Sequence, residues 1–181
     1  IQKIWCEIKN SKRPVVVAGW GIHLSNTENE FLEFINKYQL PVALTWGASD
    51  LIESENNLYI GTFGTHGMRH ANFAVQNADL IISLGTRLDT KSTGSPITTF
   101  AREAKKIMID IDPAELSKFD SFGLSFDILV QDDLREFFKC FQSKQFILDK
   151  EISNKSWFEK LNNWKRKFKE IDEFEKEIDN S

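Results

Sequence analysis

The sequence predicts a doubly wound α/β fold, in which helices cover both faces of a parallel sheet. Four short runs are apolar on both faces, and strands without alternation are typical of parallel sheets buried on both sides. Amphipathic segments with helical spacing fall between these runs, an alternation that builds a sheet through right-handed crossovers. We therefore expect a Rossmann-like sheet of five or six strands, followed by a C-terminal linker helix.

The apolar runs are the expected strands. They are residues 14–18, 42–44, 80–84 and 107–111. A fifth, weaker strand is expected at about residues 124–129.

Three helices are expected among these strands. Ser25 and Glu28 have the spacing of a capping box at the start of the first. Residues 66–77 place apolar side chains at helical spacing and predict the second. Asp132 or Asp133 is able to cap the third, whose apolar face follows directly.

The end of the chain has a different composition. We divide the sequence into a domain at residues 1–147 and a charged amphipathic helix within residues 148–181, a segment that holds neither Gly nor Pro. Two interpretations of its apolar stripe are open: packing on the same domain, or docking on a domain or subunit outside this chain. The stripe consists of Trp157, Leu161, Trp164, Phe168, Ile171 and Ile178.

The composition of the chain limits its functional class. Its 181 residues suit one domain, and a net charge of −4 argues against a general nucleic-acid or membrane-surface binder. Cys6 and Cys140 lie far apart without a CxxC pattern, so we expect two buried, reduced thiols in a cytoplasmic protein. Because the first residue is Ile1, we expect the chain to be part of a longer one.

Two glycines follow the first predicted strand, as Gly19-Trp20-Gly21. They match the start of the GxGxxG nucleotide fingerprint, but Leu24 stands at the third glycine position and the usual acidic residue after the second strand is missing. The pattern argues against ordinary nicotinamide binding. A structural interpretation, in which these glycines only form the turn, is equally open.

A second glycine segment, residues 61–67, precedes the second predicted helix. We expect it to leave backbone N–H groups uncovered at the positive end of the helix, a common place for phosphate. His66 is expected to contact a ligand or cap the helix rather than to act in catalysis, because the motif holds no acidic partner.

A third segment, residues 85–94, comes immediately after the most apolar strand. Ligands of open α/β sheets bind beyond the carboxyl ends of the strands, where this loop must lie. Arg87 and Lys91 are expected to hold phosphate, with Asp89 orienting one of them. The alternative is an exposed polar loop with an internal salt bridge.

Two further carboxylates are expected at this edge. Asp110 is placed to accept a hydrogen bond from a ribose or adenine group, and Asp127 is expected to reach the edge from the fifth strand. The converging loops carry glycines, cations and carboxylates, but lack a nucleophile–base pair and a metal-ligand cluster. The crevice is therefore predicted to hold a nucleotide, and no catalytic or metal-binding residue is assigned.

Several segments follow one another in a specific order along the chain. They are Gly19-x-Gly21, Pro41-Val-x-x-Thr45, Gly64-x-His66-Gly67, Ala74-Val-Gln-Asn-Ala-Asp79, Gly85-x-Arg87-x-Asp89 and Ile109-Asp110-Ile111-Asp112-Pro113. This order resembles the central domain of thiamine-diphosphate-dependent enzymes, and in particular the large subunits of acetolactate synthase. The similarity covers roughly residues 1–142.

The resemblance implies a parent enzyme with three domains. Thiamine diphosphate and Mg²⁺ are then bound by the pyrimidine-binding and pyrophosphate-binding domains, outside this chain, which has no Gly-Asp-Gly tripeptide. The parent is expected to be a carboligase or decarboxylase, a transferase or lyase acting on pyruvate or another 2-oxo acid. It is expected to form a homodimer or homotetramer, and the present chain alone is expected to be inactive.

In acetolactate synthases the central domain holds FAD. Two departures affect this expectation: Lys91 stands where the family has arginine, and Trp20 replaces a small residue. FAD, an ADP-type nucleotide or no ligand are all compatible with the sequence, as are a free-standing flavin or nucleotide module and a purely structural spacer. The implied contacts are Gly19, Trp20, Gly21, Thr45, Trp46, Gly64, His66, Gly67, Gly85, Arg87, Asp89, Lys91, Asp110, Ile111 and Asp127.

Overall fold

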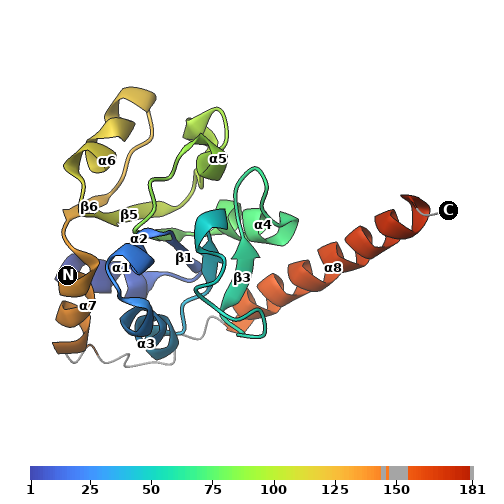
Figure 1. The fold of residues 1–181 in the computed structure, drawn as a ribbon, viewed down its shortest axis with the longest axis horizontal. Coiled ribbons are helices and arrows are strands. Elements are labelled where there is room, and N and C mark those ends of the chain that lie inside the picture. The colour runs from blue at the N-terminus through green and yellow to red at the C-terminus, as the bar shows by residue number, and fades with distance from the viewer. Residues whose placement is uncertain (144–145, 147–154, 180–181) are drawn as a thin grey trace.

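A computed structural model describes residues 1–143, 146 and 155–179, with side-chain surroundings up to residue 169. In the described chain, six parallel strands form one sheet in the order β3-β2-β1-β4-β5-β6 (Figure 1). This confirms the predicted α/β class. The strands are β1 (Pro14–Ala18), β2 (Val42–Leu44), β3 (Tyr59–Thr62), β4 (Leu80–Leu84), β5 (Lys105–Asp110) and β6 (Ile128–Gln131).

Helices cover both faces of this sheet. One apolar core lies between the sheet and α1, α3 and α7, and the other lies between the sheet and α4, α6 and the start of α8. Every residue of β1 and β4 is buried, which is why both strands read as continuous apolar runs. The helices are α1 (Gln2–Asn10), α2 (Gly21–Leu24), α3 (Glu28–Tyr38), α4 (Arg69–Asn77), α5 (Thr90–Thr93), α6 (Pro113–Ser117), α7 (Leu134–Ser143) and α8 (Lys155–Asp179).

The predicted boundaries need three corrections. The edge strand β3 was not predicted, because it spans only four residues and one of them is Gly61, at φ +126°. Strand β6 begins at Ile128 rather than near residue 124, since a 3₁₀ turn over 118–122 and buried Leu124 precede it. Helix α4 begins at Arg69, and residues 64–67 form a turn ahead of it.

The predicted capping box is wrong. A short helix, α2, occupies residues 21–24, so Ser25 lies at a helix end and its hydroxyl donates to the Gly21 carbonyl at 2.8 Å. Glu28 binds His23 at 2.8 Å instead of reaching back to cap α3. At the third predicted helix, Asp133 accepts from the Arg135 N–H at 2.9 Å, as a capping residue does.

The first part of α8 packs on the domain that precedes it. Trp157 and Leu161 are buried, and the Trp157 indole N–H donates to the Pro14 carbonyl at 3.2 Å. Trp164 packs against Phe73 of α4 with ring centroids 5.8 Å apart. The side chains of Ile171 and Ile178, which would extend the stripe, lie outside the described residues.

The two cysteines are more exposed than predicted. Cys6 is exposed on the outer face of α1 and Cys140 is partly exposed, so the prediction that both thiols are buried is wrong. Both cysteines are free.

Among the described helices, none is long and apolar enough to cross a membrane.

We expect Trp157→Ala to lower the free energy of unfolding by about 3–5 kcal/mol, because it removes a fully buried ring and its hydrogen bond to Pro14. Urea unfolding followed by circular dichroism measures the change. Asn162→Ala, at an exposed position of the same helix, is the control and is expected to leave stability nearly unchanged. Equal stability of the two variants would show that α8 does not anchor on this domain.

Candidate functional site

A cavity of about 1210 Å³ lies at the carboxyl ends of the strands. It receives residues from the segments after β1, β2, β3, β4, β5 and β6, as expected for an open α/β sheet. Gly64, Gly67 and Asp127 are not among its lining residues. The predicted residues that line it are Gly19, Trp20, Gly21, Thr45, Trp46, His66, Gly85, Arg87, Asp89, Lys91, Asp110 and Ile111.

The floor of the cavity is formed by two glycine turns in close contact. The Gly21 N–H donates to the Gly85 carbonyl at 2.9 Å, and a Cβ on Gly19 would lie 2.6 Å from the same oxygen. Gly85 itself has φ +56°, in the left-handed region that glycine adopts without strain. Backbone packing alone therefore requires these glycines, which agrees with the structural interpretation of the first motif.

The second glycine segment does not present a row of free N–H groups, and that prediction is wrong. The Gly64 N–H donates to Asn72 Oδ1 at 2.8 Å, the Thr65 N–H to the Lys91 carbonyl at 2.7 Å, and the Gly67 N–H to the Gly64 carbonyl at 3.0 Å. The segment instead forms hydrogen bonds with Asn72 of α4 and Lys91 of α5. His66 does line the cavity from an exposed position.

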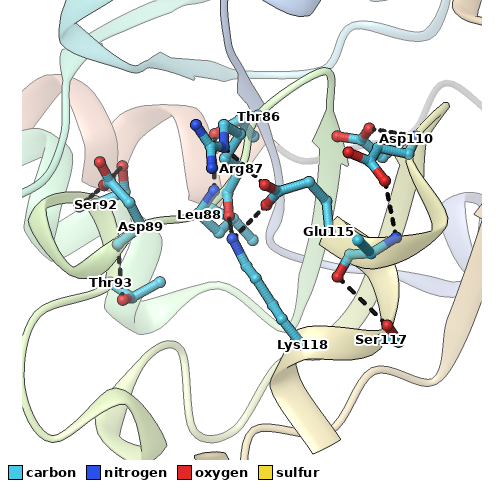
Figure 2. A network of polar contacts seen from close by, with 12 residues as sticks. Thr86, Arg87, Leu88, Asp89, Ser92, Thr93, Asp110, Glu115, Ser117 and Lys118 are labelled. Atoms are coloured by element: carbon cyan, nitrogen blue, oxygen red, sulfur yellow. Dashed lines mark hydrogen bonds and ion pairs between the residues drawn. The ribbon is translucent and has the colours of Figure 1, made fainter.

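Arg87 is bound by an acidic residue that the sequence did not single out. Its Nε donates to Glu115 Oε1 at 2.8 Å, and Lys118 contacts both Glu115 Oε2 and the Arg87 carbonyl (Figure 2). Burial alone would raise the pKa of Glu115, but the bonds from Lys118 and Arg87 outweigh it and lower that pKa. The alternative interpretation of this loop placed a salt bridge within it, whereas the observed salt bridge of Arg87 is with Glu115 of α6.

Asp89 does not orient either cation. Its side chain caps α5 by accepting from the Ser92 N–H and hydroxyl, both at 2.9 Å (Figure 2). Lys91 is exposed at the cavity wall, while its carbonyl accepts from Thr65. The loop thus brings Arg87 and Lys91 to one cavity as predicted, with its own carboxylate used for folding.

Asp110 reaches the cavity, but Asp127 does not. Asp127 precedes β6 and accepts from the Lys106 N–H at 2.8 Å, at the opposite edge of the sheet, because β6 begins later than predicted. Asp132 and Asp133, which follow β6, line the cavity in its place. Burial raises the pKa of Asp110, although the Asp112 N–H that donates to it at 3.0 Å opposes this shift.

One end of the cavity is aromatic. The exposed fractions of Trp20 and Trp46 are 50% and 80%, high values for indole side chains at a cavity wall. His23 packs on Trp20 with ring centroids 4.5 Å apart and binds Glu28 and Asp50 through its two ring nitrogens. Burial lowers the pKa of His23, but these carboxylates outweigh it and raise the pKa overall.

Several polar groups of the cavity are engaged by other protein groups. Its cations, carboxylates and rings are arranged along one edge of the sheet. Arg87 binds the carboxylate of Glu115, and Asp89 caps α5. Within the described residues, no cluster of three or more His, Cys, Asp or Glu side chains is arranged to hold a metal ion. Glu115 and Lys118 were not predicted from the sequence. They follow Asp112-Pro113, a pair typical of a helix start that could have located α6 but not the partner of Arg87.

Comparison with known proteins relates the chain to thiamine pyrophosphate enzymes. Residues 1–139 match a family model described as the central domain of thiamine pyrophosphate enzymes. The chain is 32% identical over 170 residues to the acetolactate synthase large subunit of Cyanidium caldarium, covering 93% of this chain and 28% of that protein. It is 37% identical over 135 residues to the acetolactate synthase large subunit of Lactococcus lactis subsp. lactis, covering 75% of this chain and 23% of that protein.

A third relative is the probable acetolactate synthase large subunit of Methanocaldococcus jannaschii. It is 40% identical over 111 residues, which cover 61% of this chain and 19% of that protein. The chain thus spans roughly a quarter of the length of the curated relatives it matches.

We expect Asp110→Asn to raise the free energy of unfolding at pH 7. The folded protein disfavours the buried carboxylate, so wild-type stability from this group is complete below its ordinary pKa of 3.8 and is lost as pH rises through the raised pKa. The advantage of the Asn variant should therefore shrink as pH falls toward 3.8. Urea unfolding across pH measures it, with exposed Asp120→Asn as control; a pH-independent difference would contradict the raised pKa.

Proposed function

Because the chain belongs to the family of thiamine pyrophosphate enzyme central domains, we propose that it is the middle domain of a thiamine-diphosphate-dependent carboligase or decarboxylase. The substrate class is pyruvate or another 2-oxo acid, and the reaction is of the acetolactate synthase type. The observation that carries this proposal is the match to acetolactate synthase large subunits over as much as 93% of this chain.

In this proposal the chemistry takes place outside the chain. Thiamine diphosphate supplies the nucleophilic carbon that attacks the keto group of the substrate. The cofactor and its Mg²⁺ are held by a pyrimidine-binding and a pyrophosphate-binding domain of the parent protein. The present chain contributes a rigid domain and a binding cavity.

The cavity holds FAD or an ADP-type nucleotide. Its wall changes in character along the sheet edge: Trp46 follows β2, Trp20 follows β1, Arg87 follows β4 and Asp110 is the last residue of β5. Neighbouring strands lie about 4.8 Å apart, so aromatic, cationic and carboxylate groups succeed one another over the length of a nucleotide. An aromatic ring suits the indoles, phosphates suit Arg87 and Lys91, and ribose hydroxyls suit Asp110.

A structural spacer is the second candidate. It is favoured by the glycine contacts, because backbone packing explains Gly19, Gly21 and Gly85 without any ligand, and the N–H groups of Gly64 and Gly67 are bonded internally. A free-standing flavin or nucleotide module is a third possibility for the same cavity. Nucleotide binding separates the spacer from the other two.

We extend the proposal to the domain organisation, the location and the partners of the parent protein. Residues 1–147 form the domain, and residues 148–181 link it to the pyrophosphate-binding domain through α8, whose first turns pack on α4. The parent protein is a cytoplasmic homodimer or homotetramer. Its partners are its own other domains and further copies of itself.

The parent protein provides the test of the enzyme assignment. We expect its complete sequence to encode a pyrimidine-binding domain before this one and a Gly-Asp-Gly domain after it. The complete protein, supplied with thiamine diphosphate and Mg²⁺, is expected to release CO₂ from pyruvate or another 2-oxo acid. A complete protein without those domains would contradict the assignment and favour the free-standing module.

We expect Arg87→Ala to weaken ADP and FAD binding by at least about tenfold, because a charge-assisted contact to phosphate is lost. His66→Ala is expected to have a smaller effect, since a neutral imidazole adds only an ordinary hydrogen bond. Isothermal titration calorimetry measures both, and a thermal melt checks that the fold is unchanged. Equal affinity of Arg87→Ala and wild type would exclude this loop as the phosphate site, and no binding by the wild type would favour the spacer.

A further inference from the structure

Among the residues that the structure describes, the guanidinium of Arg87 is held by one of its three nitrogens. Nε donates to Glu115 Oε1 at 2.8 Å, and within the described part of the chain neither terminal nitrogen donates to a protein group. The Arg87 side chain is 80% exposed and lines the cavity, whereas Glu115 is only 13% exposed. Of the two side chains, Glu115 is therefore the one held in place by the surrounding protein. The terminal N–H groups of Arg87 remain available to a bound ligand (Figure 2).

Glu115 is itself fixed from two directions. Lys118, one turn later, binds its second carboxylate oxygen and also donates to the Arg87 carbonyl. At the start of α6, Asp112 caps the helix by accepting from the Ala114 N–H at 2.8 Å. The carboxylate is thus set by the helix, by Lys118 and by Arg87 together, and its charge is balanced by two cations.

This arrangement has two opposite interpretations for an anionic ligand. If Glu115 stands in for the anion, it competes with a phosphate for Arg87, and removing it strengthens binding. If Glu115 orients Arg87, it aims the free terminal N–H groups and reduces the side-chain freedom lost on binding. The single bond at Nε favours orientation, because arginine normally binds a phosphate in a bidentate manner and a competing carboxylate would occupy the terminal nitrogens.

We propose that Glu115, supported by Lys118, is a positioning residue that holds Arg87 by Nε so that its terminal N–H groups face the phosphate of a nucleotide in the cavity. The inference rests on the proposed nucleotide binding and adds a residue outside the predicted set. It also gives a reason for the salt bridge between the loop after β4 and α6.

The test compares two substitutions at one position. We expect Glu115→Ala to weaken ADP binding by about three- to tenfold, because Arg87 loses its carboxylate partner and must be ordered by the ligand. Glu115→Gln is expected to stay within about twofold of wild type, since its amide oxygen still accepts from Nε. In an Arg87→Ala background, Glu115→Ala is expected to cause no further loss of affinity.

A matched control is available in α7. Glu136 is exposed and pairs with Lys139 at 3.6 Å with the same three-residue spacing as Glu115 and Lys118, but it does not line the cavity. Glu136→Ala is expected to leave ADP affinity unchanged. Calorimetric titration with ADP gives the affinities, and thermal melts of each variant separate loss of fold from loss of positioning.

The outcomes distinguish this inference from the proposed function. If the wild type binds ADP and Arg87→Ala weakens it, but Glu115→Ala binds as tightly as wild type or more tightly, nucleotide binding stands and positioning by Glu115 is overturned. Stronger binding by both Glu115→Ala and Glu115→Gln identifies Glu115 as a competing anion and also overturns it. Absence of ADP binding by the wild type overturns both.

Discussion

The close contact between the turn after β1 and the turn after β4 determines the shape of the binding edge. At this point two backbones lie so near each other that a Cβ on Gly21 would be 2.6 Å from the Gly85 Cα. Backbone hydrogen bonds also connect other neighbouring strand ends. The Thr45 N–H donates to the Ala18 carbonyl at 2.9 Å, and the Asp132 N–H donates to the Asp110 carbonyl at 3.1 Å. The sheet ladder thus continues into the loops that carry the cavity side chains.

Such backbone support leaves the side chains of the edge free to vary. Trp20 projects from between two glycines whose own positions are set by packing, and its indole remains half exposed. Lys91 uses its carbonyl to hold Thr65, while its side chain stays exposed. The side chains at these positions can therefore change without altering the sheet, because loop side chains of this kind carry no part of the packing that holds the strands.

The carboxylates of this domain illustrate how one residue type serves different purposes. Asp89 and Asp112 cap short helices, and Glu115 forms an ion pair with Arg87. Asp110, by contrast, is half buried with a raised pKa at the cavity wall. The acidic character of the edge is therefore largely a consequence of folding, and the cations are the groups left for an anionic ligand.

Burial on both faces leaves apolar runs in the amino-acid sequence. The parallel sheet, the strands β1, β2, β4 and β5, and the edge at which Arg87, Lys91 and Asp110 meet could therefore be predicted without the structure. The edge strand β3 and the start of β6 carried no such record, because an edge position buries less surface and Gly61 interrupts the apolar run. Only the tertiary structure decided which charged groups pair. Arg87 meets Glu115 across 28 residues, Asp127 falls at the opposite edge, and Asp89 turns to its own helix. These contacts depend on strand order and register, which are properties of the packed sheet as a whole. No periodic pattern in the sequence indicates them.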